Sequence, residues 1–225
     1  MITFYAAIGC YRIVNEDGQK AAYIQKLGKY HKISVPEFAV WSALLWQVMT
    51  YEELKAAYYE IMTHQSGPVM DFDELLQNLL QRKLILSGVG YTGVDALYRM
   101  LTDAFVVPYR ISAPRKAFGM IRLLVKGKLP ITGALQAMKE RKLTSNESRV
   151  VNLVEQTPLS TAELIRCFDR SVYDVSSAEK VIAAIYTDST QKEIASEQFW
   201  SPNTNPVLEA VSNLYLDRRI ILEVP

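Results

Sequence analysis

The chain has 225 residues, 49% hydrophobic and 22% charged, and its 25 basic and 24 acidic side chains leave a net charge of +1. This composition is typical of a globular protein and excludes a disordered, collagen-like or disulfide-stapled chain. The length allows one large or two modest domains, and a charge so near zero argues neither for nor against a nucleic-acid partner.

Cysteines and histidines are too few and too scattered for a metal or disulfide framework. The sequence contains only Cys10, Cys167, His31 and His64. A structural zinc site normally needs about four clustered nitrogen or sulfur ligands. We therefore expect no metal, reduced thiols and a cytoplasmic location. Since no stretch approaches ~18 uninterrupted apolar residues, we expect no membrane-spanning helix and no membrane partner.

The first thirty residues predict β-structure. Residues 3–8 are rich in β-branched and aromatic side chains, as strands are. Residues 11–14 and 21–25 flank the turn sequence Asn15-Glu16-Asp17-Gly18, which predicts a hairpin because Asp-Gly accepts positive φ. A further short strand is expected at residues 30–33.

Helix-start signals follow in an ordered series. In a capping box, a Ser or Thr hydroxyl accepts the amide three residues on, and the Glu there reaches back to the cap amide. Such boxes occur in two pairs, and the spacing within the two pairs is identical: Ser34-x-x-Glu37 with Thr50-x-x-Glu53, and Thr144-x-x-Glu147 with Ser160-x-x-Glu163.

The equal spacing predicts an internal repeat. Residues 33–58 align without gaps on residues 143–168 at an offset of 110, and residues 79–86 align on residues 215–222 at an offset of 136. Apolar positions and both capping glutamates coincide in the first alignment. The larger second offset means that the second copy carries an insertion between about residues 168 and 206. Fixed-period similarity of this kind is typical of duplicated modules.

Each copy is expected to form three helices and a closing strand. The first helices are predicted at 36–48 and 146–156, the second at 51–62 and 161–168, and the third at 72–81 and 206–217. Asp71 and Asn205 are the expected caps of the third helices. One more helix, 177–186 after the cap Ser176, is predicted within the insertion of the second copy.

Three helices with a short turn between two of them, then a strand, resemble the winged helix-turn-helix superfamily. The resemblance covers residues 34–86 and 144–222. It implies a mainly α protein with small β-elements, in which two winged-helix-like modules follow an N-terminal β-hairpin. The expected domains are residues 1–107, a connector at 108–142 and residues 143–225.

The connector concentrates the positive charge. Residues 110–142 contain nine basic side chains against one acid, a local charge of +8, whereas residues 1–109 sum to −2 and residues 143–225 to −5. Clustered Lys and Arg make a local positive field whatever the net charge is. The alternative is a solvated linker whose apolar residues pack between the modules.

A glycine motif follows the first expected closing strand at 84–86. Gly88-Val89-Gly90-Tyr91-Thr92-Gly93 matches the dinucleotide-binding fingerprint and precedes an expected helix at 94–104. That site also needs a carboxylate about 20 residues later, where this chain offers Arg110. We therefore interpret the glycines as a turn or wing tip, with dinucleotide binding as a minor alternative.

The resemblance leads to a functional hypothesis, a bacterial-type DNA-binding transcriptional regulator. Connector cations would hold the phosphates of double-stranded DNA and the third helices would enter the major groove. The candidate residues in the connector are Arg115, Lys116, Arg122, Lys126 and Lys128. Those at the third helix of the first copy are Gln77, Asn78, Gln81, Arg82 and Lys83, and those after the third helix of the second copy are Arg218 and Arg219.

The acids Asp71, Asp73 and Glu74 lie at the start of the third helix of the first copy. They argue against DNA binding by this helix, because carboxylates repel phosphate. The alternative hypothesis is a protein–protein interaction or scaffold module without DNA binding, its partner another protein or a second copy in a homodimer. No motif for nucleophilic catalysis or nucleotide binding by a P-loop is found, so we expect neither an enzyme nor a cofactor.

Overall fold

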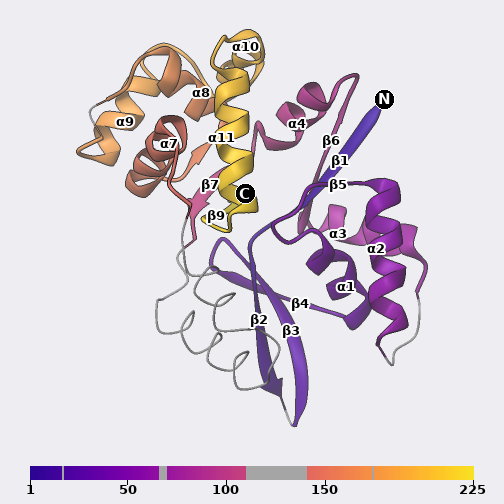
Figure 1. Ribbon diagram of the computed structural model, residues 1–225. Coiled ribbons are helices and arrows are strands. Elements are labelled where there is room, and N and C mark those ends of the chain that lie inside the picture. The colour runs from indigo at the N-terminus through magenta and orange to yellow at the C-terminus, as the bar shows by residue number, and fades with distance from the viewer. Residues whose placement is uncertain (17, 66–69, 110–140, 174) are drawn as a thin grey trace.

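Two of the three sheets have the same construction. The computed structural model describes residues 1–16, 18–65, 70–109, 141–173 and 175–225 (Figure 1). In one sheet, β1 (Ile2–Ala7) lies between β5 (Met49–Thr50) and β6 (Ile85–Gly90). In another, β7 (Phe105–Pro108) lies between β8 (Leu159–Ser160) and β9 (Ile220–Glu223). All these pairs are antiparallel, so the strand that precedes each set of three helices occupies the centre of its sheet.

The registers of the two sheets are equivalent. Phe4 lies opposite Thr50 in one sheet and Phe105 lies opposite Ser160 in the other. Thr50 and Ser160 are also the N-caps of the helices that follow, and the first sequence alignment matches them with each other. The predicted offset of 110 therefore joins structurally equivalent positions.

The predicted offset of 136 for the third helices is wrong by one position. Lys83 and Arg218 both have positive φ, 52° and 59°. The next amides close the same turn, Leu84 N to Leu79 O and Arg219 N to Leu214 O, both at 2.9 Å. This helix-ending turn makes Lys83 the counterpart of Arg218, because structural equivalence follows backbone geometry and not the apolar letters that the sequence alignment matched.

The third sheet is the predicted N-terminal hairpin with one further strand. Its order is β2 (Cys10–Glu16), β3 (Gln19–Lys26) and β4 (Lys29–Ile33), all antiparallel. The turn glycines Gly18 and Gly28 have φ of 82° and 76°, as tight hairpins require.

The helices begin where the capping boxes predict. All four predicted boxes form, with hydroxyl and carboxylate exchanging hydrogen bonds with the backbone as expected. The described helices are α1 (Val35–Ala43), α2 (Tyr51–Thr63), α3 (Phe72–Gln81), α4 (Gly93–Leu101), α7 (Ser145–Gln156), α8 (Thr161–Asp169), α9 (Ala178–Ile185), α10 (Gln191–Glu197), a 3₁₀ turn (Gln198–Trp200) and α11 (Thr204–Leu216). With three sheets beside them, the fold is mixed α/β, with more helix than strand.

Several predicted helix boundaries are corrected. α1 ends at Ala43 and not at residue 48, because the chain leaves the helix and Trp46 takes a φ of 58°. α9 is capped by Ser177, not Ser176. α11 begins at Thr204, so Asn205 lies inside the helix and is not its cap. α10, with the capping box Thr190-x-x-Glu193, was not predicted.

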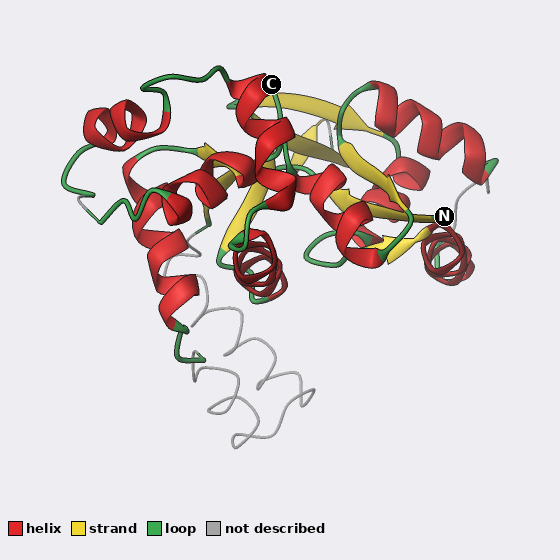
Figure 2. Ribbon diagram, turned by 90° about the horizontal axis from the view of Figure 1, so that it is seen from above, coloured by secondary structure: helices red, strands yellow, loops and turns green. Residues whose placement is uncertain are grey.

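Two buried cores share β1. Tyr5 and Ala7 belong to the core made with α1, α2 and α3, whereas Ala6 and Ile8 belong to the core made with α4, α7, α8 and α11. Alternate residues of a strand point to opposite faces, so one strand supplies both cores. Figure 2 shows the strands in the middle of the molecule with helices on either side.

The predicted boundary at residues 107 and 108 falls inside β7, which pairs with β8 and β9. α4, predicted within the first domain, contributes Tyr98, Met100 and Leu101 to the C-terminal core. In the described ranges, no helix combines the length and apolarity that crossing a bilayer requires.

The glycine motif lies in β6 and α4, not in a wing tip. A Cβ on Gly88 would lie 2.3 Å from the Ala96 carbonyl oxygen, and one on Gly90 would lie 2.3 Å from the Ala96 nitrogen. The glycines therefore let the backbone of α4 lie directly on the strand. β6 pairs antiparallel with β1, whereas a dinucleotide site needs parallel strands around its helix, so this motif serves packing.

This packing predicts that alanine at Gly88 lowers the stability of the fold, whereas alanine at Gly93 has little effect. Gly88→Ala should lower the free energy of unfolding by about 2–3 kcal/mol, because its Cβ meets α4 backbone that cannot move alone. Gly93→Ala is the control, since its Cβ would lie 3.8 Å from the Phe4 ring, an ordinary contact. Urea unfolding measures both, and equal effects would contradict the packing role.

Candidate interaction surface

The solvent face of α3 is acidic at its start and polar along its length. Leu75, Leu76 and Leu79 are buried in the N-terminal core, which fixes the orientation of the helix. The exposed side chains on the other side are Asp73, Glu74, Gln77, Asn78 and Gln81. Asp71 caps the helix by accepting the Glu74 amide at 3.0 Å.

The candidate base-reading and phosphate-binding groups at the end of α3 bind other parts of the chain. Glu37, 7% exposed, accepts hydrogen bonds from Asn78 Nδ2 at 3.3 Å and Arg82 Nη1 at 2.7 Å. Arg82 Nη2 also donates to the Lys32 carbonyl at 2.6 Å, and Lys83 Nζ donates to the Pro225 carbonyl at 2.9 Å. These side chains tie the end of α3 to the start of α1 and to the segment after β9. Of the α3 candidates, Gln77 and Gln81 extend into solvent without such contacts.

One side of α11 packs into the molecule, and its other side is exposed at Asn205, Glu209 and Leu216. It stands between the α7–α8 pair and α4 (Figure 1). Val207, Val211 and Leu214 are fully buried, and the Tyr215 hydroxyl lies 3.2 Å from the Ala7 carbonyl oxygen and 3.0 Å from that of Leu44. The exposed side of α11 carries the acid Glu209 and no basic side chain, so it does not support the predicted role as a second groove-reading helix.

The basic pair after α11 is engaged as well. The Arg218 guanidinium lies 5.2 Å from the centre of the Trp46 ring, a cation–π contact. Arg219 Nη2 donates to the Arg141 carbonyl at 2.8 Å. Both arginines therefore join segments of the fold.

A buried glutamate anchors each first helix to the third helix. In the second copy Glu147, the counterpart of Glu37, accepts from Asn213 Nδ2 at 3.1 Å and from Arg141 Nη2 at 2.8 Å. Asp217, the counterpart of Arg82, replaces the arginine of the first copy and pairs with Arg141 at 2.8 Å. Arg141 thus bridges two acids where the first copy has a direct ion pair. Chiefly because of Arg141, the pKa of Glu147 is lowered to about 2, although burial opposes this.

This pair makes a prediction about acid stability. The folded pKa of Glu147 is about 2 and the ordinary value is 4.5. Its contribution is therefore complete above pH about 4.5 and is lost as the pH falls towards 2. Glu147→Gln should lower the free energy of unfolding by about 1–3 kcal/mol at pH 7. The difference in free energy of unfolding between Glu147→Gln and the parent protein should become smaller below pH about 4.5.

Unfolding in urea at several pH values from about 3 to 7 measures this gap. Glu209→Gln, at an exposed position of α11, is the matched control and should leave stability within about 0.5 kcal/mol at every pH. A gap that stays constant with pH would contradict the assignment.

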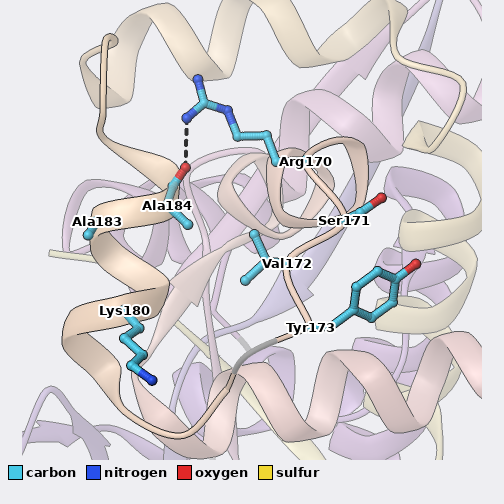
Figure 3. A pocket seen from close by; sticks show the side chains of 7 residues that line it. All are labelled: Arg170, Ser171, Val172, Tyr173, Lys180, Ala183 and Ala184. Atoms are coloured by element: carbon cyan, nitrogen blue, oxygen red, sulfur yellow. Dashed lines mark hydrogen bonds between the residues drawn. The ribbon is translucent and has the colours of Figure 1, made fainter.

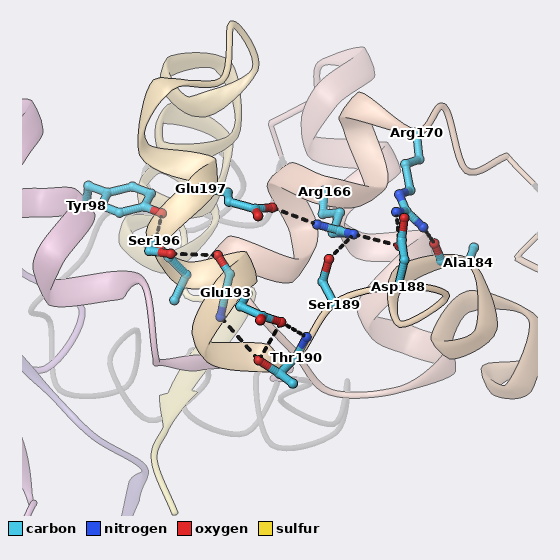
Figure 4. Close-up of polar contacts among 11 residues, drawn as sticks. Tyr98, Arg166, Arg170, Ala184, Asp188, Ser189, Thr190, Glu193, Ser196 and Glu197 are labelled. Atoms are coloured by element: carbon cyan, nitrogen blue, oxygen red, sulfur yellow. Dashed lines mark hydrogen bonds and ion pairs between the residues drawn. The ribbon is translucent and has the colours of Figure 1, made fainter.

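A second polar cluster, missed at the sequence level, holds the insertion of the second copy on α8. Arg166, 6% exposed, donates to Ser189 Oγ at 2.8 Å, Asp188 at 3.1 Å and Glu197 at 3.3 Å (Figure 4). Arg170 reaches the same Asp188 at 2.5 Å. In sequence Arg166 resembles any helical arginine, and nothing local marks it as buried. The cluster is structural, since its acids come from the elements that it fastens.

A shallow hollow beside α9 has two cations on its lining. It is lined by Arg170, Ser171, Val172, Tyr173, Lys180, Ala183 and Ala184 (Figure 3). Arg170 already donates to the Ala184 carbonyl at 2.7 Å and pairs with Asp188. The Arg149 guanidinium lies between the Phe168 and Tyr173 rings, at 4.2 and 4.7 Å from their centres. These contacts leave Arg170 committed to the fold.

The thiols are poor nucleophiles at neutral pH. Burial raises the pKa of Cys167 to about 12 and also raises that of half-buried Cys10, to which Glu223 adds. Thiolates are the reactive form, so neither residue is activated. In the part of the chain that the structure describes, no three His, Cys, Asp or Glu residues gather as metal ligands.

The five connector candidates Arg115, Lys116, Arg122, Lys126 and Lys128 lie outside the described residues. No protein-family model matches the chain, and neither does any curated protein or solved structure. The surface of the chain itself must therefore indicate the function.

Proposed function

We propose that this chain is a protein–protein interaction module that binds a partner through the solvent face of α3, without DNA binding. In this proposal each half is a winged-helix-like unit whose elements are connected differently from those of a plain winged helix. In each, three helices accompany a three-stranded sheet whose central strand comes first in sequence. β6 leads into α4, so no wing hairpin follows α3.

The acidic start of α3 is the observation that carries this proposal. DNA presents phosphates on both sides of the major groove, so a recognition helix needs free cations or amides at its docking end. α3 begins instead with exposed Asp73 and Glu74, and its Asn78 and Arg82 side chains bind Glu37. An exposed acidic helix face suits a partner with basic side chains.

A photo-crosslinking amino acid at Gln77 tests the proposal. Placed there in the full chain in its native host, it should yield a discrete covalent product with another protein. Glu74→Lys in the same chain should abolish that product by reversing the charge at the docking end. The same amino acid at exposed Glu179 on α9 is the control and should yield none. A product with DNA, or none at Gln77, would overturn the proposal.

The DNA-binding alternative depends on the connector and has its own test. In a mobility-shift assay on mixed-sequence duplex DNA at about 50 mM salt, we expect no retarded complex, because the described candidate cations, Arg82, Lys83, Arg218 and Arg219, are engaged within the fold. The counter-result is retardation that disappears when Arg115, Lys116, Arg122, Lys126 and Lys128 are all neutralised. In that case the salt slope should flatten by about 0.9 per lost phosphate contact, and the regulator hypothesis would be correct.

A further inference from the structure

Among the described residues, β2 is an edge strand with no partner on its outer side. The order of its sheet is β2-β3-β4, and among the described strands β2 pairs with β3 alone. The pairing is continuous from Cys10 opposite Gln25 to Glu16 opposite Gln19, so no bulge twists the edge away. The strand also contains no proline. Soluble proteins usually block such an edge, because its unpaired amides and carbonyls accept another strand.

One face of this edge is apolar and open to solvent. Tyr11 and Ile13 are 46% and 52% exposed. The Tyr11 ring packs against the half-buried Phe38 ring of α1, with centroids 5.6 Å apart. Ile13 lies opposite Ala22 of β3, which in turn lies opposite buried Ile33 of β4. The apolar surface of the sheet therefore continues outward to its free edge, where nothing among the described residues covers it.

The other face of the edge carries one positive and one negative side chain. Arg12 and Glu16 lie on the same face, with Val14 midway between them. If a second copy of β2 pairs antiparallel about a two-fold axis at Val14, each Arg12 lies opposite Glu16 of the other copy. The two Ile13 side chains then become diagonal neighbours on the apolar face, within contact range.

Glu16 can accept this additional partner. It already accepts hydrogen bonds from the Tyr23 hydroxyl and from Lys32 Nζ, the latter at 2.8 Å. A carboxylate has about four acceptor sites, so capacity remains for the Arg12 guanidinium. Strand, apolar face and charges are thus all self-complementary, which favours a second copy of this chain over an unrelated peptide.

We infer that two copies of this chain associate through antiparallel pairing of their β2 strands, forming one continuous six-stranded sheet across the dimer. The pairing uses β2 and not the α3 face, so it is independent of the proposed function. A single pair of short strands buries less surface than the ~1,200 Å² typical of a stable interface. The dimer should therefore dissociate in the micromolar range.

Sedimentation equilibrium of the full chain from about 2 to 200 μM tests this inference, as that range brackets a micromolar dissociation constant. The expected result is a monomer–dimer equilibrium. Ile13→Lys should weaken the dimer at least about tenfold, by placing cations diagonally across the two-fold axis. Arg12→Glu should do the same by placing Glu opposite Glu16, and its exposed position keeps folding intact if Ile13→Lys does not fold.

The matched control is Ile182→Lys, which alters an isoleucine of similar exposure, 43%, on α9. It should leave the equilibrium unchanged. A parent chain that remains monomeric at the highest concentration would overturn the inference. The inference would also be overturned if the Ile13→Lys and Arg12→Glu chains are folded and dimerise as tightly as the parent.

Discussion

The sharing of β1 between two cores is the constraint on which the rest of the structure depends. Tyr5 and Ala7 face α1, α2 and α3, and Ala6 and Ile8 face the C-terminal helices. The strand is held at its end by hydrogen bonds from both halves: the Ile8 amide donates to the Leu84 carbonyl at 3.1 Å, and the Gly9 amide donates to the Leu222 carbonyl at 2.8 Å. Both cores therefore depend on β1, and neither is complete without it.

This sharing limits what α11 can do. A helix that reads DNA must present one face to a groove about 12 Å wide. α11 packs against α7, α8 and α4, and its Tyr215 hydroxyl contacts backbone of the first half. α11 thus connects the two halves through its buried side, and its exposed side offers no cation. α3, the third helix of the first half, has the more polar exposed side, and that side is acidic where the helix begins.

The sequence predicted well what short-range chemistry determines. Capping boxes involve residues three apart, so Ser34, Thr50, Thr144 and Ser160 located four helix starts correctly. The placement of β1 between β5 and β6 was not predictable from local pattern, because both partner strands come much later in the chain. The wing-tip interpretation of Gly88 and Gly90 was wrong for the same reason. The clash that a side chain at either position would make involves the backbone of α4, which comes into contact only in the folded structure.

Part of the candidate site was visible in sequence as well. The acids of α3 argue against phosphate binding from the sequence alone, whereas the prediction that Asn78 and Arg82 contact DNA overlooked a partner within the chain. That partner is Glu37, whose capping contact uses Oε2 and leaves Oε1 available. A buried capping glutamate with a spare oxygen demands a donor from a neighbouring helix, but which helix supplies it depends on the tertiary fold.

Native-state hydrogen exchange measures the shared strand most directly. The hydrogen-bonded amides of β1 and of β7 should open with free energies within about 1 kcal/mol of each other, because losing either core exposes the other. Ile8→Ala, which truncates a side chain of the C-terminal core directly after β1, should lower both free energies by the same amount. Amides of β1 that retain their protection while those of β7 lose theirs would show that the two halves unfold separately, and would contradict the account.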